Sequence, residues 1–192
     1  DAAVVAIGWA HLDPDRALAE LRSLLRGQWS TGMVPHIVYD PTVPPGAYEP
    51  GPGRWATAGL SPPGVATSGI CQPPVHALAL GRVREVAAGR DDGSLARVDR
   101  AIAALYPRLA RWHRWLHTAR DPEGTGLVTI FHPWESGLDN SPRWDEALAA
   151  VAPDDGPAGP RPDLAHVADA GERPTDTDYR RYRALVRSLA DL

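Results

Sequence analysis

The chain has 192 residues and a formal net charge of −4, which suits one folded domain with its own core. Hydrophobic residues make up 43% of the chain and charged residues 23%, proportions that argue against disorder. No basic stripe and no bilayer-length apolar run is present, so neither nucleic acid nor a membrane is an expected partner. The single cysteine, Cys71, excludes an internal disulfide and indicates a reducing compartment.

Helical periodicity dominates the sequence and defines six candidate helices. The clearest start is Asp13 followed by Pro14, an N-cap residue before a proline at the first helical position. The longest apolar stripe repeats every three or four residues from Leu95 to Leu116, and Pro107 within it predicts a kink or a break. In chain order, we expect helices over residues 2–10, 14–26, 73–89, 95–116, 142–148 and 176–192.

Three long Pro/Gly-rich connections join these helices, at residues 28–70, 120–142 and 151–175. Loops of this length within a compact helical protein are usually functional or disordered. The first two carry Trp, His, Tyr and Gln side chains, which favours function, whereas 153–174 is acidic and is predicted to be a surface flap. The only plausible strand is 127–131. The prediction is therefore an all-α array of antiparallel helix pairs.

The densest group of reactive side chains is the run His-Pro-Trp-Glu-Ser-Gly-Leu-Asp-Asn-Ser-Pro-Arg-Trp-Asp at residues 132–145. Its carboxylates Glu135 and Asp139 lie among indole rings, and shielding from water favours the neutral form that a general acid needs. Alternatively, Glu135 caps a turn and Asp139 forms an Asx turn with Asn140. The seven tryptophans of the chain suit either a sugar platform or a core. Residue types alone leave both interpretations open.

Other catalytic patterns receive less support. His113 and His117 have a metal-ligand spacing, but no further ligand accompanies them, so no metal and no other cofactor is expected. The sequence has neither a G-x-S-x-G elbow nor a Gly-rich phosphate loop. An arginine cluster is interpreted as the solvated side of the last helix, with a clamp for an anionic aglycone as the alternative; it comprises Arg180, Arg181, Arg183 and Arg187.

The run at 132–145 closely resembles the signature of glycoside hydrolase family 63, nearest to its bacterial mannosylglycerate and glucosylglycerate hydrolase-like enzymes. Two other segments agree in order, Gly-Met-Val-Pro-His-Ile-Val-Tyr at 32–39 and Ser-Gly-Ile-Cys-Gln-Pro-Pro-Val-His at 68–76. The resemblance covers essentially the whole chain. It implies a toroid barrel of twelve helices, (α/α)6, and the six helices expected in this chain are about half of that barrel. The long Pro/Gly-rich loops would then lie at the active-site face. We therefore expect one partial catalytic domain over 1–192, truncated at both ends.

The resemblance further implies an inverting exo-α-glycosidase acting on a small α-glucoside or α-mannoside, such as glucosylglycerate or mannosylglycerate. Asp139 would be the general acid. The family's base, a Glu in its later half, has no counterpart in this sequence, and Glu135 is too close to Asp139 to replace it. The chain alone is therefore expected to be inactive.

The resemblance also implies which residues bind substrate. Trp134 would be a platform for the sugar ring, Glu135 would accept hydrogen bonds from sugar hydroxyls, and Gln72 would bind the sugar or the aglycone. The other implied binding residues are Asp1, His36, Tyr48, Asn140 and Tyr179, of which His36 equally suits a structural role. Cys71 is expected to be a buried small side chain.

Two alternatives remain, a trehalase-like α-glucosidase and a non-catalytic carbohydrate-binding remnant. Trehalases share the helical barrel and a similar Glu-Ser-Gly-x-Asp run, but the Asp-Asn-Ser-Pro continuation favours family 63. The expected partners are a small carbohydrate and either the missing half of the barrel or a second copy, held through an exposed apolar helix face. The resemblance and the single cysteine predict a cytoplasmic location.

Overall fold

A computed structural model describes residues 1–44, 46–156 and 161–190 of the chain. Within these residues there is no strand, and only an isolated bridge joins Val38 to Thr67. The prediction of an all-α protein is confirmed. The α-helices are α1 (Ala2–Leu12), α2 (Pro14–Leu25), α3 (His76–Ala88), α4 (Ser94–Ala119), α5 (Asp145–Ala149) and α6 (Asp176–Ala190).

The helices agree with the sequence prediction apart from three details. The helix predicted over 142–148 begins as a 3-10 turn at Pro142–Trp144, and α5 follows only from Asp145. Helix α3 begins at His76 rather than at the prolines before it, and α4 continues through Pro107 without a break. The predicted end of the last helix, at residues 191–192, lies outside the described residues. The predicted flap is described on either side of residues 157–160, with short 3-10 turns at Pro162–His166 and Ala170–Glu172.

The strand predicted at 127–131 is wrong. This segment has no regular structure, and Leu127 within it is 75% exposed. A strand needs a neighbouring segment to satisfy its backbone groups. In the described part of the chain, the one backbone–backbone bond from 127–131 to another segment is from Thr129 N to Arg120 O, at 2.6 Å.

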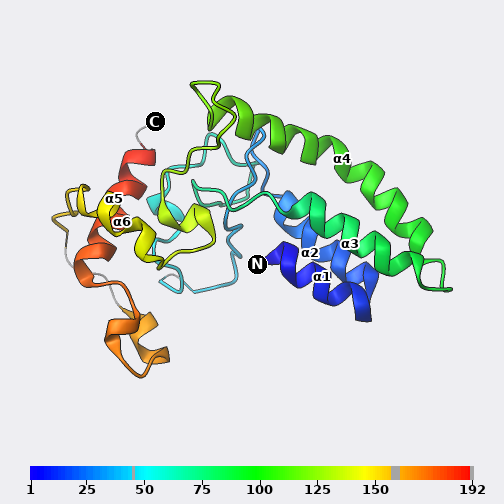
Figure 1. Cartoon of the computed structure of the whole chain (residues 1–192), viewed down its shortest axis with the longest axis horizontal. Coiled ribbons are helices and arrows are strands. Elements are labelled where there is room, and N and C mark those ends of the chain that lie inside the picture. Colours follow the sequence, from blue (N-terminus) through cyan, green and yellow to red (C-terminus); the bar gives the residue numbers. More distant parts are fainter. Residues whose placement is uncertain (45, 157–160, 191–192) are drawn as a thin grey trace.

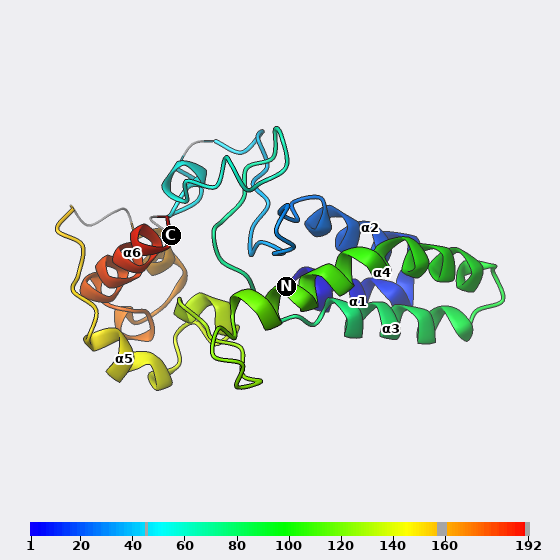
Figure 2. The same cartoon turned by 90° about the horizontal axis from the view of Figure 1, so that it is seen from above.

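Helices α1 to α4 pack as two antiparallel hairpins into one four-helix unit (Figures 1 and 2). Asp13 makes the first turn sharp, because its backbone N–H ends α1 while its side chain accepts hydrogen bonds from Asp15 N and Arg16 N of α2. The interior contains leucines of α2, valines of α3 and α4, and the fully buried Trp112. Apolar stripes on α2 and α4 therefore supply the core that the periodicity predicted.

The antiparallel arrangement puts both hairpin turns at one end of the unit, and it puts the N-terminus and the three helix ends that lead into long loops at the other. The start of α1, the end of α2, the start of α3 and the end of α4 all face the middle of the molecule, where the long loops lie (Figure 2). The loops therefore gather at a single face of the helices.

The loop after α2 is tied closely to α4. Gln28 donates from Nε2 to the carbonyls of Gly32 and Arg108, both at 2.9 Å. Gly32 has φ +112°, and a Cβ there would lie 2.8 Å from the carbonyl oxygen of Arg111. The positive φ and this short distance together allow only glycine at position 32. The Gly-Met-Val-Pro-His segment thus starts from a fixed point on the four-helix unit.

A second, smaller apolar cluster forms beyond the loops, against α6. Tyr39, Trp55, Ile70 and Val186 are buried in it, with Trp134 packed at its side. Trp55 donates from Nε1 to the Tyr39 hydroxyl at 2.7 Å, and that hydroxyl donates to Pro50 O at 2.9 Å. These bonds satisfy the polar atoms of two buried aromatics, as burial requires. Helix α6 and the loop segments thus share one small core.

Candidate active site

A cavity of about 330 Å³ opens between the loops and α6. Six of the residues implied to bind or act on substrate line it together: His36, Tyr48, Trp134, Asp139, Asn140 and Tyr179. They come from three separate parts of the chain, and only tertiary structure brings them together. The cavity walls combine aromatic rings with charged and polar side chains, which together can orient a bound small molecule.

Asp139 has the environment of a group that can hold a proton. It follows the turn at Gly137, whose φ is +70°, and lies at the cavity wall. Desolvation by the surrounding atoms raises the pKa of the Asp139 carboxyl above its ordinary value. Among the described residues, no cation makes an ion pair with it. A carboxyl group whose pKa is raised at a cavity wall has the property that a general acid needs.

Aromatic rings form a continuous series beside Asp139. The ring of Trp134 lies 4.3 Å from His132 and 5.4 Å from Tyr182, and Tyr182 lies 5.6 Å from Tyr179, all between ring centroids. Tyr182 is buried and belongs to α6. Helix α6 therefore fixes the two pocket aromatics, Trp134 and Tyr179, relative to each other.

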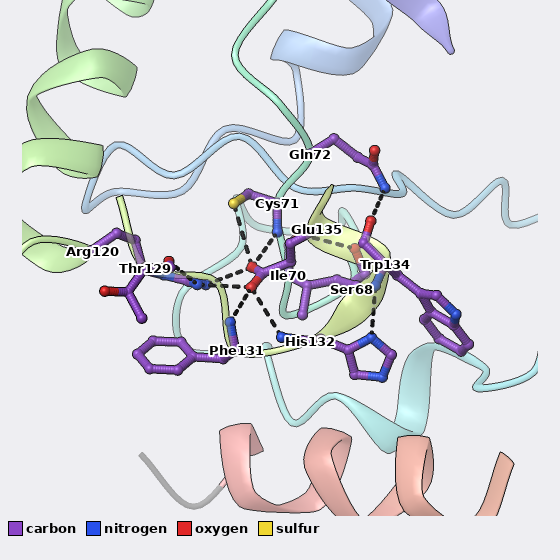
Figure 3. A network of polar contacts seen from close by, with 10 residues as sticks. All are labelled: Ser68, Ile70, Cys71, Gln72, Arg120, Thr129, Phe131, His132, Trp134 and Glu135. Atoms are coloured by element: carbon purple, nitrogen blue, oxygen red, sulfur yellow. Dashed lines mark hydrogen bonds and ion pairs between the residues drawn. The ribbon is translucent and has the colours of Figure 1, made fainter. Parts of the chain in front are cut away.

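Glu135 lies in a different environment, although it is only four residues before Asp139. Figure 3 shows its carboxylate enclosed by donors: both guanidinium NH groups of Arg120, at 2.7 and 2.9 Å, and the backbone N–H groups of Cys71 at 3.1 Å and Phe131 at 2.8 Å. Burial alone would raise the pKa of Glu135. The hydrogen bonds and charge of Arg120 outweigh burial and hold that pKa below its ordinary value.

This geometry corrects the role expected of Glu135. Its side chain is 0% exposed and it does not line the cavity, so its oxygens are not available to sugar hydroxyls. Residue types alone had left open that Glu135 caps a local turn. The structure contains this cap, because the Glu135 side chain accepts a hydrogen bond from the backbone N–H of His132. No motif or spacing in the sequence marked Arg120, fifteen residues earlier, as the partner of Glu135.

Gln72 and Asp1 lie close to the site but are not among the cavity-lining residues. Gln72, which was expected to bind the sugar or the aglycone, donates from Nε2 to the backbone carbonyl of Trp134 at 2.5 Å (Figure 3). Asp1 stands at the loop-facing end of α1, and its amino group contributes to lowering the pKa of His36. Cys71 is buried as predicted, with its thiol 3.4 Å from Glu135 Oε1.

The structure adds cavity residues that sequence reasoning missed. Tyr39 and Trp55 contribute rings, Glu49 contributes a second carboxylate, and Arg173 contributes a guanidinium. The Nε atom of Arg173 is buried with no hydrogen-bond partner among the described residues. Tyr39 is the last residue of the 32–39 segment, one of the motifs that carry the family resemblance. Arg173 lies in the segment that was predicted to be a flap, so nothing in the sequence marked it.

The arginine cluster of α6 does not line the cavity, and part of it forms ion pairs. Arg181 bonds Asp178 at 3.1 Å and donates to the carbonyl of Val151, and Arg187 pairs with Asp154. These contacts attach the 151–156 segment to α6. The cluster is therefore not simply a solvated face.

No group of three or more His, Cys, Asp and Glu side chains in the described part of the chain is arranged to hold a metal ion. In the same residues, no helix is long and apolar enough to cross a membrane.

Comparison with known proteins identifies the family of the chain. The family profile described as the mannosylglycerate hydrolase MGH1-like glycoside hydrolase domain matches residues 1–191. The chain belongs to this family. The resemblance identified from the motifs, to glycoside hydrolase family 63, is confirmed.

Individual relatives are similar to this MGH1-like chain over nearly all of its length. The glucosylglycerate hydrolase of Mycolicibacterium hassiacum is 46% identical over 98% of this chain, which spans 43% of that protein. The crystal structure of the GH63 mannosylglycerate hydrolase of Thermus thermophilus in complex with Tris has a TM-score of 0.84, with 41% identity, over 100% of this chain and 43% of its own. Its complex with Tris and D-glycerate has a TM-score of 0.82, with 43% identity, over 97% of this chain and 42% of its own. The helical fold thus matches part of the fold of those hydrolases, as expected for part of an α/α toroid.

The buried histidines generate a prediction for acid stability. Burial lowers the pKa of His132 from 6.5 to about 4, while its Nδ1 accepts a hydrogen bond from Trp134 N. The unfolded chain therefore binds more protons between these two pH values, and the free energy of unfolding should decrease as pH falls from about 6.5 to about 4.

We expect His132→Asn to reduce this dependence, since asparagine keeps a capping oxygen but does not titrate. Part of the dependence should remain, because burial also lowers the pKa of His36 and of His76 to about 4. Urea unfolding of the chain at pH 7.5 and at pH 4.5 measures the difference. His117→Asn, at an exposed position of α4, is the matched control and should leave the dependence as it is. An unchanged slope in His132→Asn would contradict the prediction.

Proposed function

We propose that the chain supplies the general-acid part of a glycoside hydrolase site. The proposed reaction is inverting hydrolysis of a small α-glucoside or α-mannoside, such as glucosylglycerate or mannosylglycerate. The observation that carries the proposal is a cavity that combines Asp139, whose pKa is raised, with the rings of Trp134 and Tyr179. The names of the relatives, glucosylglycerate and mannosylglycerate hydrolases, support the substrate class.

In the proposed reaction, Asp139 donates its proton to the glycosidic oxygen as the bond to the anomeric carbon breaks. A water molecule attacks that carbon from the opposite face and loses a proton to a carboxylate base. In inverting enzymes the two carboxyl groups stand about 6.5–9.5 Å apart, which leaves room for the water. Glu135 cannot be this base, because it is buried and paired with Arg120. We propose that the base lies outside this chain.

Arg173 gives the pocket a preference for a charged aglycone. A glycerate group carries a carboxylate, and a guanidinium is the side chain best shaped to bind one. Arg173 lines the cavity, and its buried Nε has no hydrogen-bond partner among the described residues. The hydroxyl of the neighbouring Tyr179 already donates to Asp163 at 3.2 Å, so Arg173 is the donor that the proposal relies on. Arg173 is thus a better candidate for the anionic clamp than the arginine cluster of α6.

The chain is proposed to be one partial catalytic domain over 1–192, completed by further helices. Apolar side chains stand exposed along adjacent faces of α1 and α3: Val4 at 67%, Leu12 at 73% and Leu78 at 59%. The relatives are more than twice as long as this chain, and their additional helices would cover such a face. A cytoplasmic location remains a prediction from the single cysteine and the family resemblance.

The central test is hydrolysis of glucosylglycerate and mannosylglycerate by the complete reading frame that contains this chain. The complete protein should cleave at least one of them, and Asp139→Asn should lower kcat by about 10²–10⁴-fold, the range for loss of a general acid. The 192-residue chain alone should be inactive because it lacks the base.

The outcomes separate the alternatives. An inactive complete protein that still binds the sugar would favour a non-catalytic binding remnant, and trehalose as the preferred substrate would favour the trehalase-like alternative. Turnover by the chain alone would mean that a carboxylate within it completes the pair. Glu49, the other carboxylate at the cavity wall, would then be the group to replace.

Replacing Arg173 should affect only substrates with a charged aglycone. For Arg173→Gln we expect KM for a glycerate glycoside to rise by about 10-fold or more, the worth of a charge-assisted hydrogen bond. KM for an uncharged α-glucoside should stay the same. Arg143→Gln, at an exposed position, serves as the control. An equal effect of Arg173→Gln on both substrates would refute the clamp.

The exposed apolar face should make the isolated chain self-associate. The triple variant Val4→Ser, Leu12→Ser, Leu78→Ser should shift the chain toward monomer in sedimentation velocity, because burial of that face drives the association. Tyr106→Ser removes an equally exposed aromatic side chain, 68% exposed on α4, and should change nothing. A wild-type chain that is monomeric at every concentration would contradict this expectation.

A further inference from the structure

The buried ion pair between Arg120 and Glu135 joins parts of the chain that carry different functions. Arg120 is the C-cap residue of α4, at the loop-facing end of the four-helix unit. Glu135 lies in the 3-10 turn Pro133–Ser136, directly after Trp134 and four residues before Asp139. Their side chains are 4% and 0% exposed. The pair is therefore a direct link from the rigid helices to the loop that carries the proposed acid.

The contacts around the pair fix the loop at several points (Figure 3). Glu135 accepts hydrogen bonds from the backbone of Cys71 on one side and of Phe131 and His132 on the other. The residue after Cys71, Gln72, donates a hydrogen bond from Nε2 to the Trp134 carbonyl. Segments 71–72 and 131–135 are consequently joined through one carboxylate.

Arg120 is held in place independently of Glu135. Its guanidinium carbon lies 4.5 Å from the ring centroid of Phe131 and 5.0 Å from that of Trp115, distances typical of cation–π contacts. A guanidinium with this orientation presents two parallel N–H groups, which match the two oxygens of a carboxylate. A lysine in the same place would keep the charge but not this two-point match.

We propose that Arg120 and Glu135 are positioning residues that hold the Trp134–Asp139 loop in a fixed position at the pocket. They act through that loop and not through contact with the sugar. This inference rests on the proposed function, because it assigns Asp139 as the group being positioned. A misplacement of a catalytic group by about 1 Å can cost about 10²-fold in rate.

The test uses Arg120→Lys and Glu135→Gln in the complete protein, with the exposed pair Arg84 and Asp99 as matched control. That control pair joins α3 to α4 at the same 2.7 Å, with side chains 51% and 44% exposed. For Arg120→Lys and Glu135→Gln we expect kcat to fall by about 10²-fold and KM to change by less than about threefold. Arg84→Lys and Asp99→Asn should leave both constants unchanged.

A second measurement, hydrogen exchange, makes the test independent of activity. In the two variants, exchange should become faster in the peptide covering 131–141 and stay slow in α2 and α4. Uniformly faster exchange would mean that the pair only stabilises the fold, and a rise in KM at unchanged kcat would mean direct sugar binding; either result overturns the proposal. If the wild-type protein is inactive, the proposed function fails, and the exchange result alone decides whether the pair positions the loop.

Discussion

One buried carboxylate–guanidinium pair connects the helices of this chain to its pocket. Removing both charges of Arg120 and Glu135 from water is costly, and such a pair contributes only when its geometry is good and its remaining hydrogen-bonding capacity is satisfied. Both conditions hold, since the two side chains bond at two points and backbone N–H groups occupy the rest of the carboxylate. Leaving either partner unpaired in that position would be far less favourable than keeping both.

The pair also explains how two carboxylates four residues apart can differ in chemistry. Glu135 is surrounded by donors and paired with a cation, which favours its ionised form, whereas Asp139 has no ion-pair partner among the described residues and desolvation raises its pKa. Local environment thus separates a structural carboxylate from a candidate acid within one short loop. The turn at Gly137 makes this possible, because it directs the chain out of the buried network toward the pocket.

The arrangement divides the molecule between a scaffold and a site. The two helix hairpins bury their apolar stripes against each other and leave the loops at one face. The pocket is then assembled from the segment after α2, the loop after α4, and the region around α6. Polar anchors such as Gln28 and Arg120 attach these loops to the scaffold, so a pocket made of irregular chain can still hold a defined shape.

The sequence by itself determined the helices, the family and the residues of the signature. Apolar spacing, the Asp13-Pro14 start and the long Pro/Gly-rich connections are local features, so the all-α fold and its loops could be predicted without knowing any partner. Six of the implied site residues, Asp139 among them, line one cavity, and their roles there stay predictions.

Tertiary structure alone decided which groups meet. Glu135 was assigned to the sugar because its partner Arg120 stands at the end of another element, and no spacing rule relates the two. Arg173 was missed because its position depends on how the 161–173 segment folds back against α6. The strand predicted at 127–131 does not form because a strand requires a neighbour that the sequence cannot specify. Burial, pairing and proximity are long-range properties, and they fix the charge state and the role of each side chain.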